Sequence, residues 1–123
     1  MTDAPILDEH RLNLIAEMSP LIANVIQGPP SVCLTFNLEG DERRWVQYFD
    51  DQVNMACFAD DQPDDLLERL GPSVVVAFEP RQYLTVTLAA RDPESIAAWI
   101  YDWFQHALEA GDAFVLDAAT EEL

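Results

Sequence analysis

The chain has 123 residues, of which 23 are acidic and only six are basic, so its formal net charge is −17 at pH 7. A surface this negative repels phosphate backbones and anionic lipid headgroups, so we expect neither nucleic acid nor a membrane surface as a partner. Half of the residues are hydrophobic, unlike in an acidic disordered tail, which predicts one folded domain over residues 1–123 with an ordered core at about 8–110.

Targeting and redox features are sparse. The N-terminus has no basic region followed by an apolar run, and no apolar stretch approaches the roughly 18 residues of a membrane span. Cys33 and Cys57 are too few for a disulfide scaffold and lie in apolar, strand-like runs, which favours buried thiols. These features predict a soluble, cytoplasmic protein.

The first expected element is a helix from about residue 7 to residue 27, where apolar side chains recur at helical spacing. Pro20 interrupts this segment, so we expect a kink, or two helices with Ser19 capping the second. Gly28, followed by two prolines, ends it.

Three strands should follow. Residues 31–38 alternate apolar and polar side chains with a period of two, which predicts a strand with one buried face. Residues 44–49 and 53–58 have strand character as well, and only short turns separate the three segments. Short connections favour antiparallel neighbours, so we expect a three-stranded meander.

A short helix over about residues 66–70 comes next, opened by an aspartate cap with proline in its first turn and closed by Gly71. Two further strands are expected at residues 73–79 and 82–89.

The last helix is the clearest one. It opens at Asp92-Pro93 and ends at Gly111, and its buried stripe includes Trp99 and Trp103. The tail, residues 112–123, adds a short strand or frays. The order α-β-β-β-α-β-β-α predicts an α+β fold in which helices pack on an antiparallel sheet.

Catalytic and metal-binding motifs are absent from the sequence. No nucleophile elbow, P-loop or Rossmann glycine pattern occurs, and His10 and His106 read as a surface and a helix-end histidine. The cysteines and histidines lack metal-ligand spacing, and helix capping and solvation explain the acidic run at residues 60–65. We therefore expect no enzyme, no catalytic residue, no metal and no cofactor.

One face of the second expected strand is a candidate binding surface. Trp45, Gln47 and Phe49 lie on the same side of the second strand. If the helices cover the opposite side of the sheet, this face is open to an apolar side chain or a second subunit. Ordinary core packing is the alternative.

The element order resembles that of class I type III secretion chaperones, which are small acidic proteins, and of the YbjN-type (TY-Chap) peptide-binding domain. The similar segments are the run from Trp45 to Phe49, the run from Leu67 to Gly71, and the helix entered through Asp92-Pro93-Glu94.

The resemblance implies a partner polypeptide against the first helix and the sheet, and a homodimer around the second helix and the strand that follows it. The residues implied at this dimer contact are Leu66, Leu67, Leu70, Val74, Val76 and Phe78. The negative surface would favour a basic or amphipathic segment.

Two other interpretations stay open. An acidic inhibitor, such as an immunity protein or a nucleic-acid mimic, would mask a basic partner if its carboxylates gather on one face. Alternatively, the absence of lysine and the abundance of aspartate reflect adaptation to high salt in a protein of unrelated function.

Overall fold

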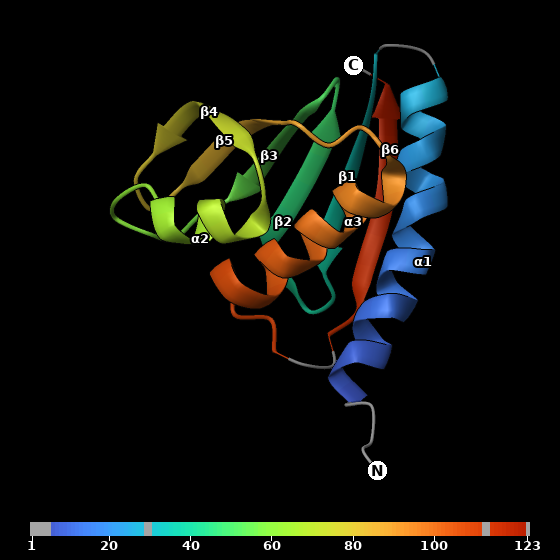
Figure 1. Cartoon of the computed structure of the whole chain (residues 1–123), viewed down its shortest axis with the longest axis horizontal. Helices are drawn as coiled ribbons and strands as arrows, with labels where there is room; N and C mark the ends of the chain where they lie inside the picture. The colour runs from blue at the N-terminus through green and yellow to red at the C-terminus, as the bar shows by residue number, and fades with distance from the viewer. Residues whose placement is uncertain (1–5, 29–30, 112–113, 123) are drawn as a thin grey trace.

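An antiparallel sheet of six strands carries a layer of helices on one of its faces (Figure 1). The computed structural model describes residues 6–28, 31–111 and 114–122. In chain order the elements are α1 (Ile6–Gln27), β1 (Val32–Leu38), β2 (Asp41–Phe49), β3 (Gln52–Ala56), α2 (Asp64–Leu70), β4 (Ser73–Glu79), β5 (Tyr83–Leu88), α3 (Pro93–Asp102), the π-helical turn η1 (Trp103–Ala107) and β6 (Leu116–Glu122). The α+β class and the predicted element order are confirmed, and the tail adds a sixth strand.

The strands lie in the order β4-β5-β3-β2-β1-β6, so β4 and β6 form the two edges of the sheet. The predicted meander of β1, β2 and β3 is present, because β1 pairs with β2 and β2 pairs with β3, both antiparallel. β5 then pairs with β3, and β4 lies outside β5. The chain therefore passes from β3 to the far edge through α2 and returns in β5, which lies between β4 and β3.

Helix α1 is one continuous helix, and Pro20 lies inside it. The expected alternative of two helices capped by Ser19 is not observed. Instead the Ser19 hydroxyl donates a hydrogen bond to the Ile15 carbonyl one turn earlier, at 2.6 Å. Met18 and Ile22, on either side of the proline, are both buried in the core, and this packing holds the helix together across the interruption.

The two shorter helices begin differently. In α2 the N-cap position is Pro63 and no side chain caps the helix, so the expected aspartate cap is wrong; the aspartates at 64 and 65 lie within the first turn instead, near the positive helix end. In α3 the Asp92 carboxylate accepts a hydrogen bond from the Ser95 backbone N–H at 2.9 Å, as the sequence predicts. Gly71, with φ of 123°, follows α2 directly.

The end of the last helix lies earlier than Gly111. The helix widens into η1, whose first two carbonyls, those of Trp103 and Phe104, accept from the backbone N–H groups of Leu108 and Ala110. Arg44 at the start of β2 donates from Nε to the Leu108 carbonyl at 2.6 Å. An arginine from the sheet thus places a positive charge at the negative end of the helix.

The core lies between the sheet and the helices. Trp103 is fully buried and Trp99 is 4% exposed, and their rings stack at 5.8 Å between centroids, which confirms the expectation that both belong to the core. Leu34 and Phe36 of β1 and Ile100 of α3 are buried with them.

His10 is half-buried, contrary to the expected exposed helix start. Its Nε2 donates to the Phe114 carbonyl at 2.9 Å, since a carbonyl can only accept, and a hydrogen bond of 2.8 Å joins its Nδ1 to the Tyr101 hydroxyl. The ring therefore links α1, α3 and the segment before β6.

Candidate functional site

The face of the sheet opposite the helices is uncovered. In β2, Val46 and Tyr48 are buried against the helices, and the residues that alternate with them point the other way. Trp45, Gln47 and Phe49 are these alternating residues, and all three are half-buried. Trp45 also packs against the buried core, as the alternative of ordinary core packing expects, whereas Phe49 does not. The strand face that the sequence marks as a possible open surface is the helix-free face.

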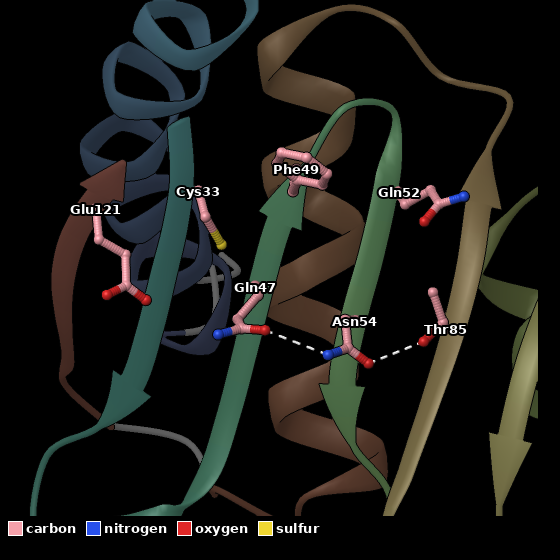
Figure 2. A pocket seen from close by; sticks show the side chains of 7 residues that line it. All are labelled: Cys33, Gln47, Phe49, Gln52, Asn54, Thr85 and Glu121. Atoms are coloured by element: carbon pink, nitrogen blue, oxygen red, sulfur yellow. Dashed lines mark hydrogen bonds between the residues drawn. The ribbon is translucent and has the colours of Figure 1, made fainter. Parts of the chain in front are cut away.

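Four side chains on this face form a hydrogen-bonded row across four strands, called here the polar ladder. The Thr85 hydroxyl donates to Asn54 Oδ1 at 2.8 Å, and Asn54 Nδ2 donates to Gln47 Oε1 at 3.2 Å. Gln47 Nε2 completes the row with a longer contact of 3.4 Å to the Thr35 hydroxyl. Figure 2 shows the part of the ladder from Gln47 through Asn54 to Thr85, with the helices behind the sheet. Each amide group keeps one N–H for a further acceptor.

A shallow hollow of about 300 Å³ surrounds the ladder. Its lining residues come from β1, β2, β3, β5 and β6 and are Cys33, Gln47, Phe49, Gln52, Asn54, Thr85 and Glu121 (Figure 2). Phe49 lies at one end of the hollow, and Glu121 lies at the side formed by β6. The lining is thus mainly neutral, with an aromatic ring at one end and a carboxylate at one border.

The nucleophile nearest the hollow is Cys33, which is 5% exposed. Burial raises the pKa of its thiol, the Glu121 carboxylate raises it further, and a hydrogen bond with Thr35 opposes the shift. The thiol therefore stays protonated at neutral pH and is a poor nucleophile.

The borders of the helix-free face differ in character. On β6 the side chains facing this side include Asp117 and Glu121, which are exposed and belong to none of the ion pairs among the described residues. On β4 the exposed side chains are Val74 and Val76, at 68% and 53% exposure, and Glu79 at the end of the strand. The face thus passes from acidic at β6, through aromatic and polar residues, to a β4 border with two exposed valines and one carboxylate.

The residues implied for a dimer contact are divided between two sides of the sheet. Leu67 is buried, and Leu66, Leu70 and Phe78 pack against the core from the helix side. Val74 and Val76 lie exposed at the β4 edge, and an irregularity between Val75 and Ala77 breaks the alternation that would otherwise place Phe78 on the same face as Val74. The six residues do not make one continuous surface.

Sequence reasoning missed the partners of Gln47. Asn54 and Thr85 join it because the register pairs Gln47 with Asn54 and Asn54 with Thr85. Polar residues at alternate positions of β3 and β5 were the available signal, but the order of the strands decides which of them meet.

Within residues 6–28, 31–111 and 114–122, no group of three or more metal-ligating side chains is close enough to hold an ion, and no helix is long and apolar enough to cross a membrane. No protein-family model, no curated protein and no solved structure matches the chain.

Proposed function

We propose that this chain is a non-enzymatic, cytoplasmic polypeptide-binding module, similar in role to a secretion chaperone or a YbjN-type domain. The observation that carries the proposal is the uncovered sheet face with Trp45 and Phe49 on either side of Gln47 in the polar ladder. Trp45 packs partly against the core, whereas Phe49 does not, and a large aromatic ring left partly exposed on a flat surface is typical of an interaction site.

The residues of this face suit a polypeptide. Aromatic rings provide large, rigid contact areas and are enriched where interfaces gain most of their energy. Gln47 and Asn54 offer amide N–H groups that can meet main-chain carbonyls of a bound segment. The hollow is shallow and open, which suits a side chain or a strand better than a small molecule enclosed on all sides.

The charge of the chain indicates the kind of segment. Asp117 and Glu121 border the face at β6, and Val74 and Val76 border it at β4. An amphipathic segment would place basic residues near β6 and apolar residues toward β4. The partner we propose is therefore a basic or amphipathic polypeptide.

Enzymatic chemistry at this face has little support. The Cys33 thiol is held in its protonated form by burial, and no histidine lines the hollow. A nucleophile without an adjacent base does not form the pair that covalent catalysis requires.

The acidic-inhibitor alternative needs carboxylates gathered on one face. Exposed acidic residues occur instead on α1, on α2, on α3, at the turns and on β6. This spread is what a salt-adapted surface would have as well, so folding should be followed by circular dichroism from low salt to molar KCl. Loss of the fold at low salt would favour salt adaptation.

A homodimer is part of the proposal. β4 is an edge strand with unpaired backbone groups and two exposed valines, so a second copy can add to the sheet there. Light scattering should give twice the mass of the chain, and Val76→Lys should return the mass to that of a monomer.

The binding proposal is tested with a random peptide library displayed on phage. We expect selection on the wild-type chain to enrich basic, amphipathic peptides. Their affinity should fall about tenfold or more with Trp45→Ala or Phe49→Ala, as for central aromatic residues of an interface.

Leu12→Ala is the matched control, because Leu12 is 65% exposed on α1, in the helix layer. Peptides whose affinity falls as much with Leu12→Ala as with Phe49→Ala would place the binding surface elsewhere, and a selection without enriched peptides would contradict the function.

A further inference from the structure

Strand β6 is attached to the sheet almost entirely through its backbone. It pairs along its whole length with β1 only, from Leu38 opposite Leu116 to Val32 opposite Glu122. Every residue from 117 to 122 is exposed, on both faces of the strand. The last apolar anchors lie at its start, where Phe114 is buried and Leu116 is half-buried. Residues 117–122 therefore lack the apolar burial that holds the other strands.

The other edge strand shows the contrast. β4 places Val75 and Phe78 on the helix side, where both pack against the core. At the equivalent positions β6 has Ala118, Thr120 and Glu122, all of them exposed. Strands with few buried apolar contacts are the ones that open locally while the rest of a protein stays folded.

Charge weakens the hold of β6 as well. The seven residues of β6 include the three carboxylates Asp117, Glu121 and Glu122. None of the three is in an ion pair among the described residues. In a chain of net charge −17, these carboxylates are repelled by the excess of negative charge on the rest of the protein.

The strand beneath is much more apolar. On the helix side of β1, Leu34 is fully buried and Phe36 is 1% exposed, and they lie opposite Thr120 and Ala118. A strand with larger apolar residues at these positions and neutral or basic residues in place of the three carboxylates would bury more surface and remove the repulsion. β6 thus pairs with the β1 edge less well than another segment could.

We propose that β6 opens from the sheet in the native state, and that the β1 edge which it uncovers accepts an extended, basic or neutral strand of the partner polypeptide. The inference rests on the proposed function for the identity of the partner. It adds that the partner enters the sheet at β1 by strand pairing, next to the helix-free face.

The two cysteines provide the readout for the opening. Cys33 is paired across the strands with Glu121 of β6, so opening of β6 uncovers it. Cys57 is 2% exposed and follows β3, and the strands β2 and β1 separate β3 from β6. Burial raises the pKa of both thiols, so neither is intrinsically activated. Global unfolding exposes both cysteines, whereas opening of β6 exposes Cys33 alone.

The experiment measures alkylation by iodoacetamide in the Cys33→Ala and Cys57→Ala variants, with rates normalised to those in urea. We expect native Cys33 to react about tenfold or more faster than native Cys57, because local opening is more frequent than global unfolding. Thr120→Val should lower the alkylation rate of Cys33 several-fold and leave that of Cys57 unchanged. Thr120→Ser should not lower the alkylation rate of Cys33. Equal native rates for the two cysteines would overturn the opening of β6.

Strand entry is tested on the full chain with a labelled peptide of residues 114–122 that carries Asp117→Lys, Glu121→Lys and Glu122→Lys. Fluorescence anisotropy should show saturable binding that Thr120→Val weakens, because a better-held β6 competes with the peptide. A scrambled peptide of the same composition controls for simple charge attraction.

Entry at β1 would be overturned if Thr120→Val did not weaken peptide binding. It would also be overturned if the scrambled peptide bound equally well. Neither result would affect the proposed function, whose test depends on Trp45 and Phe49. If Trp45→Ala and Phe49→Ala did not lower the affinity for peptides while Cys33 was still alkylated faster than Cys57, the proposed function would be contradicted. The opening of β6 would not be.

Discussion

The stacked pair Trp99 and Trp103 allows a sharp test of the core. Both side chains are buried, and their rings are nearly parallel, with 4° between the planes. Trp103 Nε1 donates to the Ala56 carbonyl of β3 at 3.1 Å, whereas Trp99 Nε1 has no hydrogen-bond partner among the described residues. The same substitution to phenylalanine therefore removes a used donor at one position and an unused donor at the other.

The two substitutions remove the same group of atoms from neighbouring sites, so their cavity costs largely cancel in the comparison. Trp103→Phe leaves the Ala56 carbonyl without this donor, which costs about 1–3 kcal/mol. Trp99→Phe relieves a buried unpaired donor, a gain of similar size. We expect Trp103→Phe to lower the free energy of unfolding by about 2 kcal/mol or more beyond Trp99→Phe.

Urea unfolding followed by far-ultraviolet circular dichroism gives both free energies. Comparable slopes with denaturant would confirm that the variants share one denatured state. Equal destabilisation, or a larger loss with Trp99→Phe, would refute the reasoning, because it would mean that the Trp99 donor is satisfied.

Two further predictions concern the α2–β4 region and the entry to α3. Leu67→Ala should lower the free energy of unfolding by about 2–5 kcal/mol, because Leu67 is buried, whereas Val74→Ala should change it by about 0.5 kcal/mol or less. Similar urea midpoints for these two variants would contradict their placement. The hydrogen bonds from Ser95 hold the pKa of Asp92 below its usual value, so the stability they give is present above the unfolded-state pKa and is lost as the pH falls through the folded-state pKa. The thermal midpoint of the wild type should therefore fall more steeply below about pH 4 than that of Asp92→Ala, and parallel curves would argue against the cap.

Most of the fold is readable from the sequence because its strands and helices have strong periodicity. Residues 31–38 alternate cleanly and residues 73–79 form an apolar run of strand-forming side chains, and both became strands close to those bounds. The strand β6 was only one of two expectations for the tail, because Leu116 is its single large apolar residue and its pairing with β1 is a backbone interaction. Such a strand has no periodic signal to find.

The site is predictable only in part. Trp45, Gln47 and Phe49 share a face by simple alternation, which a single strand reveals. Asn54 and Thr85 reach Gln47 through the order of β2, β3 and β5, and this order depends on long-range pairing that local patterns do not encode. The division of Leu67 and Val74 between opposite sides of the sheet also depends on where the helices pack.

The central claim is that a polypeptide partner lies on the helix-free face, and site-specific photocrosslinking tests it most directly. The photoreactive residue p-benzoylphenylalanine is placed at Phe49 in one chain and at Leu12 in another, and each is irradiated in the native host. We expect position 49 to crosslink to a polypeptide segment rich in basic and apolar residues, and position 12 on α1 not to crosslink. Crosslinks at position 12 alone, or equal crosslinking at both positions, would contradict it.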